Sequence, residues 1–257
     1  MKSFFLVIGL LIFTVQPCFS DEQGQCEGID TAAISSIGRG TLGGALSGAS
    51  IVSRKPIDDL GMCEVIVRMR GGRYLPCYIS GNSMILGHLY KDGQNITEHG
   101  IAEIRKSSFL GNRSELDKIV AFTYRPRVKK TSLYMITDPL CPYCHKVESQ
   151  IRDLADKYNA QINVILYSVH GSHGAKKCIE AVCRNFTLDD YLNEDWKTGN
   201  ADNYQCERGN ELIEKTRRII SEIGIEGVPM FIDGNGGSVS RANLPALKEL
   251  ISQAKGE

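Results

Sequence analysis

Between residues 60 and 93 the chain alternates in part between apolar and polar positions. Three such runs, 62–69, 74–79 and 83–90, are separated by short glycine-containing turns. Short strands joined by turns of this kind predict an antiparallel meander. Because a small sheet has an apolar face to cover, it needs a helix or a second copy of itself. The N-terminal half is therefore compatible with dimerisation.

From residue 131 onward, strand-like and helical patterns alternate. β-prone apolar runs occupy 131–137, 162–167, 230–232 and 238–240, and apolar positions recur at helical spacing over 145–158, 175–192, 211–223 and 244–254. This order of elements matches a thioredoxin fold that carries a helical insertion. The predicted fold class is α+β, with a small antiparallel N-terminal sheet followed by an α/β thioredoxin-like domain.

Two further segments complete the predicted organisation. Residues 21–57 are poorly patterned, and the glycine-rich stretch 38–48 predicts a mobile surface segment rather than a helix. Residues 113–123 have the spacing of an amphipathic helix, which Pro126 and its basic neighbours end. The predicted division is a signal peptide over 1–20, an N-terminal dimerisation domain over 21–110, a linker helix and hinge over 111–130, and a catalytic domain over 131–257.

The first residues have the pattern of a secretory signal peptide. Lys2 precedes an almost unbroken apolar run over 4–15, and Cys18 and Ser20 supply small residues before Asp21. The run is too short for a stable membrane span. We therefore expect a protein that is exported to the periplasm and cleaved near Ser20.

The expected export makes the number of cysteines informative about disulfide bonds. Nine cysteines include Cys18, so eight remain after cleavage, and an even number in an oxidising compartment favours disulfide formation. The formal net charge is zero, so no basic excess indicates a nucleic-acid partner.

The Cys141-Pro142-Tyr143-Cys144 motif lies between the strand at 131–137 and the helix at 145–158. A strand, a short turn, Cys-x-x-Cys and a helix are typical of a thiol–disulfide redox site. A structural zinc site would need two more ligands at comparable spacing, and no second Cys-x-x-Cys occurs in the sequence. We therefore expect a redox site with no metal and no cofactor.

Each residue of this motif has an expected role. Cys141 begins a helix, where unpaired N–H groups and the helix dipole favour a thiolate, so it is the predicted nucleophile. Cys144 lies one turn further on and is the predicted resolving thiol. Pro142 and Tyr143 shape the approach of the two sulfurs. His145 either tunes the site electrostatically or is only a partly exposed helix residue.

A second element, Gly227-Val228-Pro229, precedes the strand at 230–232. Proline is tolerated at the start of a strand. Opposite a redox Cys-x-x-Cys, Pro229 is the predicted cis-proline, and the backbone of Val228 would pair with an extended substrate segment by strand addition.

The chain resembles the periplasmic DsbC/DsbG family of thiol–disulfide isomerases, within the thioredoxin superfamily. The resemblance rests on the stretch from Asp138 to Lys146, on Gly227-Val228-Pro229 and on the meander over 61–93. It implies a homodimer formed by a cystatin-like N-terminal domain, with misfolded or oxidised exported proteins as substrates. It also implies a membrane electron donor of the DsbD type and a structural disulfide between Cys183 and Cys206.

Two departures from the family limit this comparison. Val228 stands where DsbC and DsbG usually have threonine, and valine is more typical of DsbA-like oxidases. Cys26, Cys63, Cys77 and Cys178 are additional, so their pairing stays open. In a tight hairpin Cys63 and Cys77 would be offset by roughly 10 Å at the rise of a strand, which exceeds the ~7 Å limit for a disulfide. A bridge between them would therefore require a bulge.

The sequence thus favours an exported disulfide isomerase or reductase. A DsbA-like dithiol oxidase remains an alternative because of Val228. A third hypothesis is a dimeric chaperone whose redox activity is secondary. The motif itself does not determine the direction of electron flow.

Overall fold

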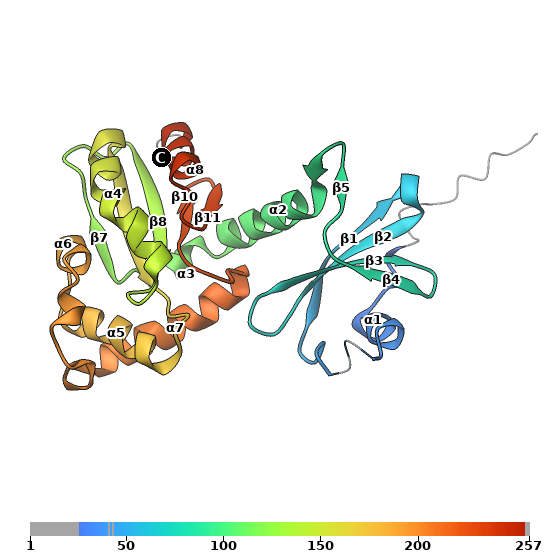
Figure 1. Cartoon of the computed structure of the whole chain (residues 1–257), viewed down its shortest axis with the longest axis horizontal. Coiled ribbons are helices and arrows are strands. Elements are labelled where there is room, and N and C mark those ends of the chain that lie inside the picture. Colours follow the sequence, from blue (N-terminus) through green and yellow to red (C-terminus); the bar gives the residue numbers. More distant parts are fainter. Residues whose placement is uncertain (1–25, 41, 43, 255–257) are drawn as a thin grey trace, which may run out of the picture.

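The computed structural model describes residues 26–40, 42 and 44–254, and shows two folded halves joined by a long helix (Figure 1). The predicted signal peptide lies outside the described residues. Among the described residues, no helix has the length and apolar character that a membrane span requires.

The N-terminal half is built on a four-stranded antiparallel sheet. Its strands are β1 (Ser50–Ile57), β2 (Met62–Arg68), β3 (Tyr74–Ser80) and β4 (Ser83–Leu86), and they follow one another in the sheet in chain order. The last three strands correspond to the predicted meander. The sheet buries its centre because β2 and β3 lie inside it, and Val65, Val67 and Cys77 are fully buried.

The described residues before the meander pack against the sheet, which differs from the expected surface stretch. Helix α1 (Thr31–Ile37) is capped by Asp30, whose side chain accepts a hydrogen bond from the Ala33 N–H. Ile34, Leu42 and Leu46 are buried against the sheet. Burial of this apolar surface compensates for a glycine-rich backbone that has little helical propensity of its own.

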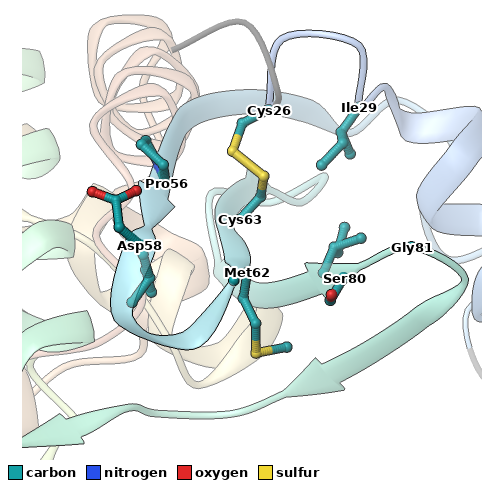
Figure 2. Close-up of a pocket in the computed structure, with 11 residues that line it drawn as sticks. Cys26, Ile29, Pro56, Asp58, Met62, Cys63, Ser80 and Gly81 are labelled. Atoms are coloured by element: carbon teal, nitrogen blue, oxygen red, sulfur yellow. A yellow bond between two sulfur atoms is a disulfide. The ribbon is translucent and has the colours of Figure 1, made fainter. Parts of the chain in front are cut away.

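A disulfide between Cys26 and Cys63 ties the start of the described chain to β2, with a Cα–Cα distance of 5.7 Å. It lies in the wall of a pocket of about 450 Å³ that Pro56, Met62 and Ser80 also line (Figure 2). The predicted alternative, a bridge from Cys63 to Cys77, is absent from the described chain. In the β2–β3 register Cys77 faces Val65 and Cys63 faces Ile79, so the two cysteines are not opposite each other.

The connection between the halves differs from the predicted linker. A two-stranded ribbon, β5 (Tyr90–Lys91) and β6 (Gln94–Asn95), leads into the long helix α2 (Ile96–Gly111). The predicted helix over 113–123 is reduced to α3 (Arg113–Asp117), and β7 (Phe122–Tyr124) joins the C-terminal sheet. Because Phe122 and Tyr124 pair with β9, tertiary strand pairing overrides the local helical spacing.

The C-terminal half contains a five-stranded sheet in the order β11-β10-β8-β9-β7. Strands β8 (Thr131–Thr137) and β9 (Ala160–Leu166) are parallel, and β10 (Met230–Asp233) and β11 (Ser238–Ser240) complete the sheet. The helices are α4 (Pro142–Tyr158), α5 (Gly171–Cys183), α6 (Leu188–Leu192), α7 (Glu207–Ile223) and α8 (Leu244–Gln253). The predicted α+β fold class is confirmed.

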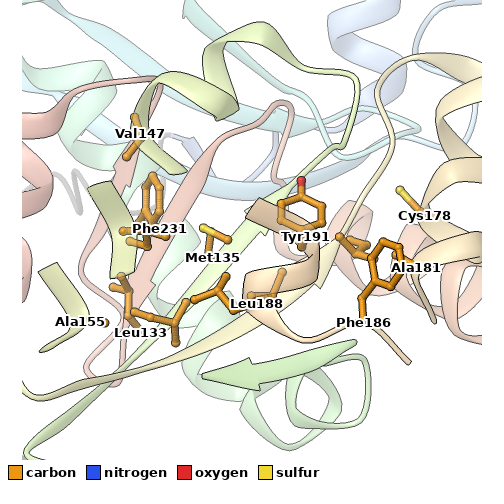
Figure 3. Close-up of a cluster of buried hydrophobic side chains, with 14 of the residues drawn as sticks. Leu133, Met135, Val147, Ala155, Cys178, Ala181, Phe186, Leu188, Tyr191 and Phe231 are labelled. Carbon is orange, nitrogen blue, oxygen red and sulfur yellow. The ribbon is translucent and has the colours of Figure 1, made fainter. Parts of the chain in front are cut away.

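The central strand β8 is buried along its whole length and sends side chains to both faces of the sheet. On one face, Leu133 and Met135 pack with Phe231 and with helices α4 and α8 (Figure 3). On the other face, Tyr134 and Ile136 pack with α7 and with the end of α2. Phe109 in α2 is fully buried in this second cluster, so the long helix is anchored in the C-terminal core.

The helical insertion is fastened by two internal features. A disulfide joins Cys183 at the end of α5 to Cys206 at the start of α7, the pairing that the family resemblance implies. Within α5 the buried Lys177 lies 3.0 Å from the carboxylate of Glu180, and it also donates to the carbonyl of Gly199 at 3.1 Å. A buried charge is tolerated when it is paired and hydrogen-bonded in this way.

Candidate functional site

Cys141 lies where strand β8 ends and helix α4 begins. The turn between them is held by the buried Asp138, whose carboxylate accepts hydrogen bonds from the N–H groups of Leu140 at 2.8 Å and Val169 at 2.7 Å. Pro142 occupies the first helical position, where its missing N–H and fixed φ suit a helix start. The turn therefore holds Cys141 at the helix N-terminus, where the peptide dipoles favour an anion.

Cys141 and Cys144 have different surroundings although they are one helical turn apart. Cys141 is only 4 % exposed and occupies the N-cap position of α4, and within the described chain its side chain makes no capping hydrogen bond. Cys144 is completely buried, and this burial raises its pKa far above the ordinary value of a thiol. The two sulfurs therefore differ in their surroundings, and the raised pKa of Cys144 keeps its thiol protonated near neutral pH.

The loop opposite Cys141 contains the cis peptide bond between Val228 and Pro229. The sulfur of Cys141 lies 3.8 Å from the carbonyl oxygen of Val228. Pro229 is buried at the start of β10, and its carbonyl accepts a hydrogen bond from the Arg241 N–H at 3.0 Å. Residues that are far apart in sequence, Cys141 and Val228-Pro229, therefore meet at one site.

A buried carboxylic acid, Glu148, lies beneath the cysteine pair. Glu148 is 5 % exposed. Its carboxylate accepts a hydrogen bond from the hydroxyl of Thr137 and another, at 3.1 Å, from the hydroxyl of Tyr191. Burial raises the pKa of its carboxyl group from 4.5 to about 7, and the hydrogen bond from Thr137 opposes the rise. Thr137 lowers the pKa of Cys144 by hydrogen bonding, and the charge of Glu148 adds to its rise.

Sequence reasoning missed Glu148. Its position in the sequence indicates burial, because Glu148 lies between Val147 and Ile151 on the face of α4 that the sequence predicts to be buried. An acidic residue on a buried face beside a Cys-x-x-Cys is a candidate proton acceptor, since perturbed carboxyl groups concentrate at functional sites.

The remaining predicted residues take different positions. The ring of His145 lies between the carbonyl of Pro139, at 2.8 Å, and the carboxylate of Glu194, at 3.1 Å. It also contacts Trp196 edge to face, so it joins the active-site turn to the helical insertion. Tyr143 is 61 % exposed. It leaves an aromatic surface beside the cysteines that a substrate can contact.

The other cysteines do not form a second dithiol site in the described chain. Cys26, Cys63, Cys183 and Cys206 are disulfide-bonded. Burial raises the pKa of Cys77 to about 11, and burial also raises that of the fully buried Cys178. Both thiols are therefore poor nucleophiles near neutral pH.

Residues 123–245 match the family model described as a thioredoxin-like domain. No curated protein matches the chain in sequence. Among solved structures, a linker-deletion mutant of Proteus mirabilis ScsC is 19 % identical with a TM-score of 0.48, over 62 % of this chain and 85 % of that chain. The thiol-disulfide exchange protein alpha-DsbA2 of Wolbachia pipientis is 13 % identical with a TM-score of 0.48, over 59 % and 96 %.

DsbG of Helicobacter pylori is 18 % identical with a TM-score of 0.35, and the match covers 78 % of this chain and 98 % of that chain. The match to a thioredoxin-like domain agrees with the thioredoxin fold that the sequence predicts for the C-terminal half.

Proposed function

We propose that the protein is an exported thiol–disulfide oxidoreductase that reduces or rearranges disulfides in other periplasmic proteins. The observation that carries this proposal is the meeting of Cys141 with the cis peptide bond of Val228-Pro229, at a sulfur-to-oxygen distance of 3.8 Å. A substrate strand that pairs with the backbone of Val228 would bring its disulfide next to the Cys141 sulfur.

The first chemical step is attack by the Cys141 thiolate on one sulfur of a substrate disulfide. A bond forms between Cys141 and that sulfur, the substrate disulfide breaks, and the second substrate sulfur leaves as a thiolate. In isomerisation this thiolate attacks another disulfide of the substrate. A later substrate thiolate then displaces Cys141, so no net electrons are transferred.

In reduction, Cys144 releases the substrate. The Cys144 thiol passes its proton through the Thr137 hydroxyl to Glu148, and the resulting thiolate attacks the Cys141 sulfur. Both groups contact Thr137. The products are a Cys141–Cys144 disulfide and a reduced substrate. Two electrons must then return from a dithiol donor, for which we propose a membrane protein of the DsbD type.

We further propose that the protein acts as a homodimer assembled through its N-terminal sheet. Strand β4 lies at an edge of that sheet, and its side chains Ile85 and Leu86 are 59 % and 38 % exposed. An edge strand with exposed apolar side chains favours pairing with a second chain.

A dithiol oxidase is the second candidate. The observation that favours it is Val228, because valine before the cis-proline is more typical of DsbA-like oxidases. The oxidase differs from the reductase in the direction of electron flow, whereas isomerisation transfers no net electrons.

The decisive measurement is the redox state of Cys141 and Cys144 in the periplasm, obtained by trapping free thiols with an alkylating reagent of known mass. A mostly reduced pair supports the isomerase or reductase, and a mostly oxidised pair supports the oxidase. Insulin reduction and refolding of scrambled ribonuclease by the purified mature chain provide the matching activities. Gel filtration tests the dimer. A protein that exchanges no disulfide in any of these assays would contradict the proposed function.

A further inference from the structure

The N-terminal half caps the helix that leads into the cis-proline loop. The last carbonyl groups of an α-helix have no partner inside the helix. At the end of α7 these carbonyls accept hydrogen bonds from the other half of the chain: Arg68 Nη1 donates to Glu222 at 2.7 Å, the Tyr74 hydroxyl to Ile223 at 3.1 Å, and Arg105 Nε to Gly224 at 3.4 Å. Donors and cations are the favourable partners at this end of a helix.

The two halves also pack closely against each other at the end of α7. Gly224 has φ +78°, and a Cβ atom there would lie 2.4 Å from the Tyr74 ring. Gly72, at the turn between β2 and β3, approaches Ser221 so closely that a Cβ atom would lie 2.5 Å from its carbonyl oxygen. Figure 1 shows this turn reaching the end of α7. Glycine at both positions allows the two backbones to approach.

A pocket of about 340 Å³ remains between the two halves, and we call it the interdomain pocket. Tyr74, His88 and Ile101 line it from the N-terminal half, and Val228, Pro229 and Arg241 line it from the C-terminal half. The cis-proline loop is therefore a wall of this pocket. Val228 lines this pocket and its carbonyl also contacts the sulfur of Cys141, so one residue links the pocket to the cysteine.

We propose that the interdomain pocket is a subsite for the substrate polypeptide that flanks the cysteine attacked by Cys141. This inference rests on the proposed function. An extended segment paired with Val228 advances about 3.3 Å per residue and sends alternate side chains to the same face. A side chain two residues from the substrate cysteine therefore lies roughly 7 Å along the loop, where the interdomain pocket opens.

The lining of the interdomain pocket suits a polypeptide better than a small anion. Each half contributes one acidic and one basic residue, Glu98 and Arg105 from the N-terminal half and Glu226 and Arg241 from the C-terminal half. Such a balanced set offers donors and acceptors to a peptide backbone without a strong net field.

Arg241 gives independent support. Its φ is +65°, a conformation that is uncommon for any residue other than glycine. Its N–H donates to the carbonyl of Pro229, so the strained residue is held against the cis-proline. Strain of this kind concentrates at functional sites.

The direct test uses the mature full-length chain with Cys144→Ala, so that a mixed disulfide cannot be resolved. The probe is a short peptide with one cysteine activated as a 2-pyridyl disulfide and a benzophenone amino acid two residues away. Cys141 attacks the peptide sulfur, and pyridine-2-thione leaves. After irradiation, mass spectrometry should locate cross-links at 74–105 and at 240–241.

The outcomes separate the two proposals. If pyridine-2-thione is released and the cross-links map only elsewhere, the subsite is wrong and the thiol chemistry stands. If Cys141 releases no pyridine-2-thione, the proposed function itself fails. A matched probe with the benzophenone at the far end of a longer peptide should lose the cross-links at 74–105.

A kinetic test uses exposed histidines of the same half. His88→Trp should fill the interdomain pocket and raise KM for a peptide disulfide by about tenfold, or roughly 1.4 kcal/mol of binding. The rate with a small disulfide such as oxidised glutathione should not change. His99→Trp is the matched control, since His99 is exposed on α2 and does not line this pocket. Equal KM values for the two variants would overturn the subsite.

Discussion

The start of α4 carries Cys141, the end of α7 leads into the cis-proline loop, and the two helix ends use their unpaired backbone groups differently. At the start of α4, Cys141 is the N-cap residue and its side chain makes no capping hydrogen bond within the described chain. At the end of α7, three side chains of the N-terminal half bond the terminal carbonyls. One helix end leaves its N-cap side chain free for the chemistry that we propose, and the other is capped by side chains of the N-terminal half next to the cis-proline loop.

This comparison predicts that changes at α4 affect chemistry, and that changes at α7 affect stability and placement. The two sets of effects should separate when activity and the free energy of unfolding are measured on the same variants.

The largest effect is expected at the start of α4. Cys141→Ala removes the proposed nucleophile and should abolish both insulin reduction and mixed-disulfide formation, because no other described free thiol lies at the N-cap of a helix beside the cis-proline loop. The matched control, Cys77→Ala, should retain full activity. Residual exchange in the Cys141→Ala variant would assign the nucleophile to another cysteine.

The second prediction concerns Glu148. Only its ionised form accepts the Cys144 proton, so the rate of substrate release should rise with pH through about 7. Glu148→Gln should remove this inflection and slow release by roughly 10²-fold, a typical effect of losing general-base catalysis. Stopped-flow measurement of the decay of the mixed disulfide tests this. Exposed Glu103→Gln serves as the control, and an unchanged pH profile in Glu148→Gln would exclude the relay.

The same residue should make stability depend on pH. An unfolded glutamic acid ionises near 4.5, whereas burial holds the pKa of folded Glu148 at about 7. The folded state therefore loses stability as pH rises from 4.5 to about 7. At pH 8 the free energy of unfolding of the Glu148→Gln variant should exceed that of the parent by about 3 kcal/mol, reduced by whatever the variant loses in hydrogen bonding. At pH 4 this gain in stability should vanish. Urea unfolding at both pH values measures the difference.

The third prediction is at the end of α7. Gly224→Ala places a methyl group against the Tyr74 ring in a left-handed conformation, so it should lower the free energy of unfolding by about 2 kcal/mol. Gly227→Ala is the matched control, because a Cβ atom there meets nothing within 4 Å. Similar stabilities for the two variants would show that the halves do not pack in this way.

The smallest effect is expected for Tyr74→Phe. It keeps the ring and removes only the hydroxyl that donates to Ile223, which should cost about 1 kcal/mol of stability. Tyr204→Phe, at an exposed tyrosine, should have no measurable effect. Thermal unfolding of both variants provides the comparison, and an equal shift in Tm would contradict the proposed capping.

Prediction from the sequence succeeded where a local pattern coincides with a buried element. Strand β8, helix α4 and strand β10 fall at or near their predicted ranges because their apolar spacing is regular. Strand β1 and helix α1 were missed, since Arg54, Lys55 and the glycines of that region give no regular period. There the order comes from the pairing of β1 with β2 and from the burial of Ile34, Leu42 and Leu46.

The sequence by itself determined the reacting motif, because a strand, a turn and a helix around Cys141 and Cys144 are set by contacts between near neighbours. It also placed Pro229 at the start of a strand. Only the tertiary structure decided that Thr137 donates a hydrogen bond to Glu148 near Cys144, and that Arg68, Tyr74 and Arg105 cap α7. These groups are brought together by long-range packing. The spacing of residues along the chain does not indicate which distant carbonyl or thiol a side chain will contact.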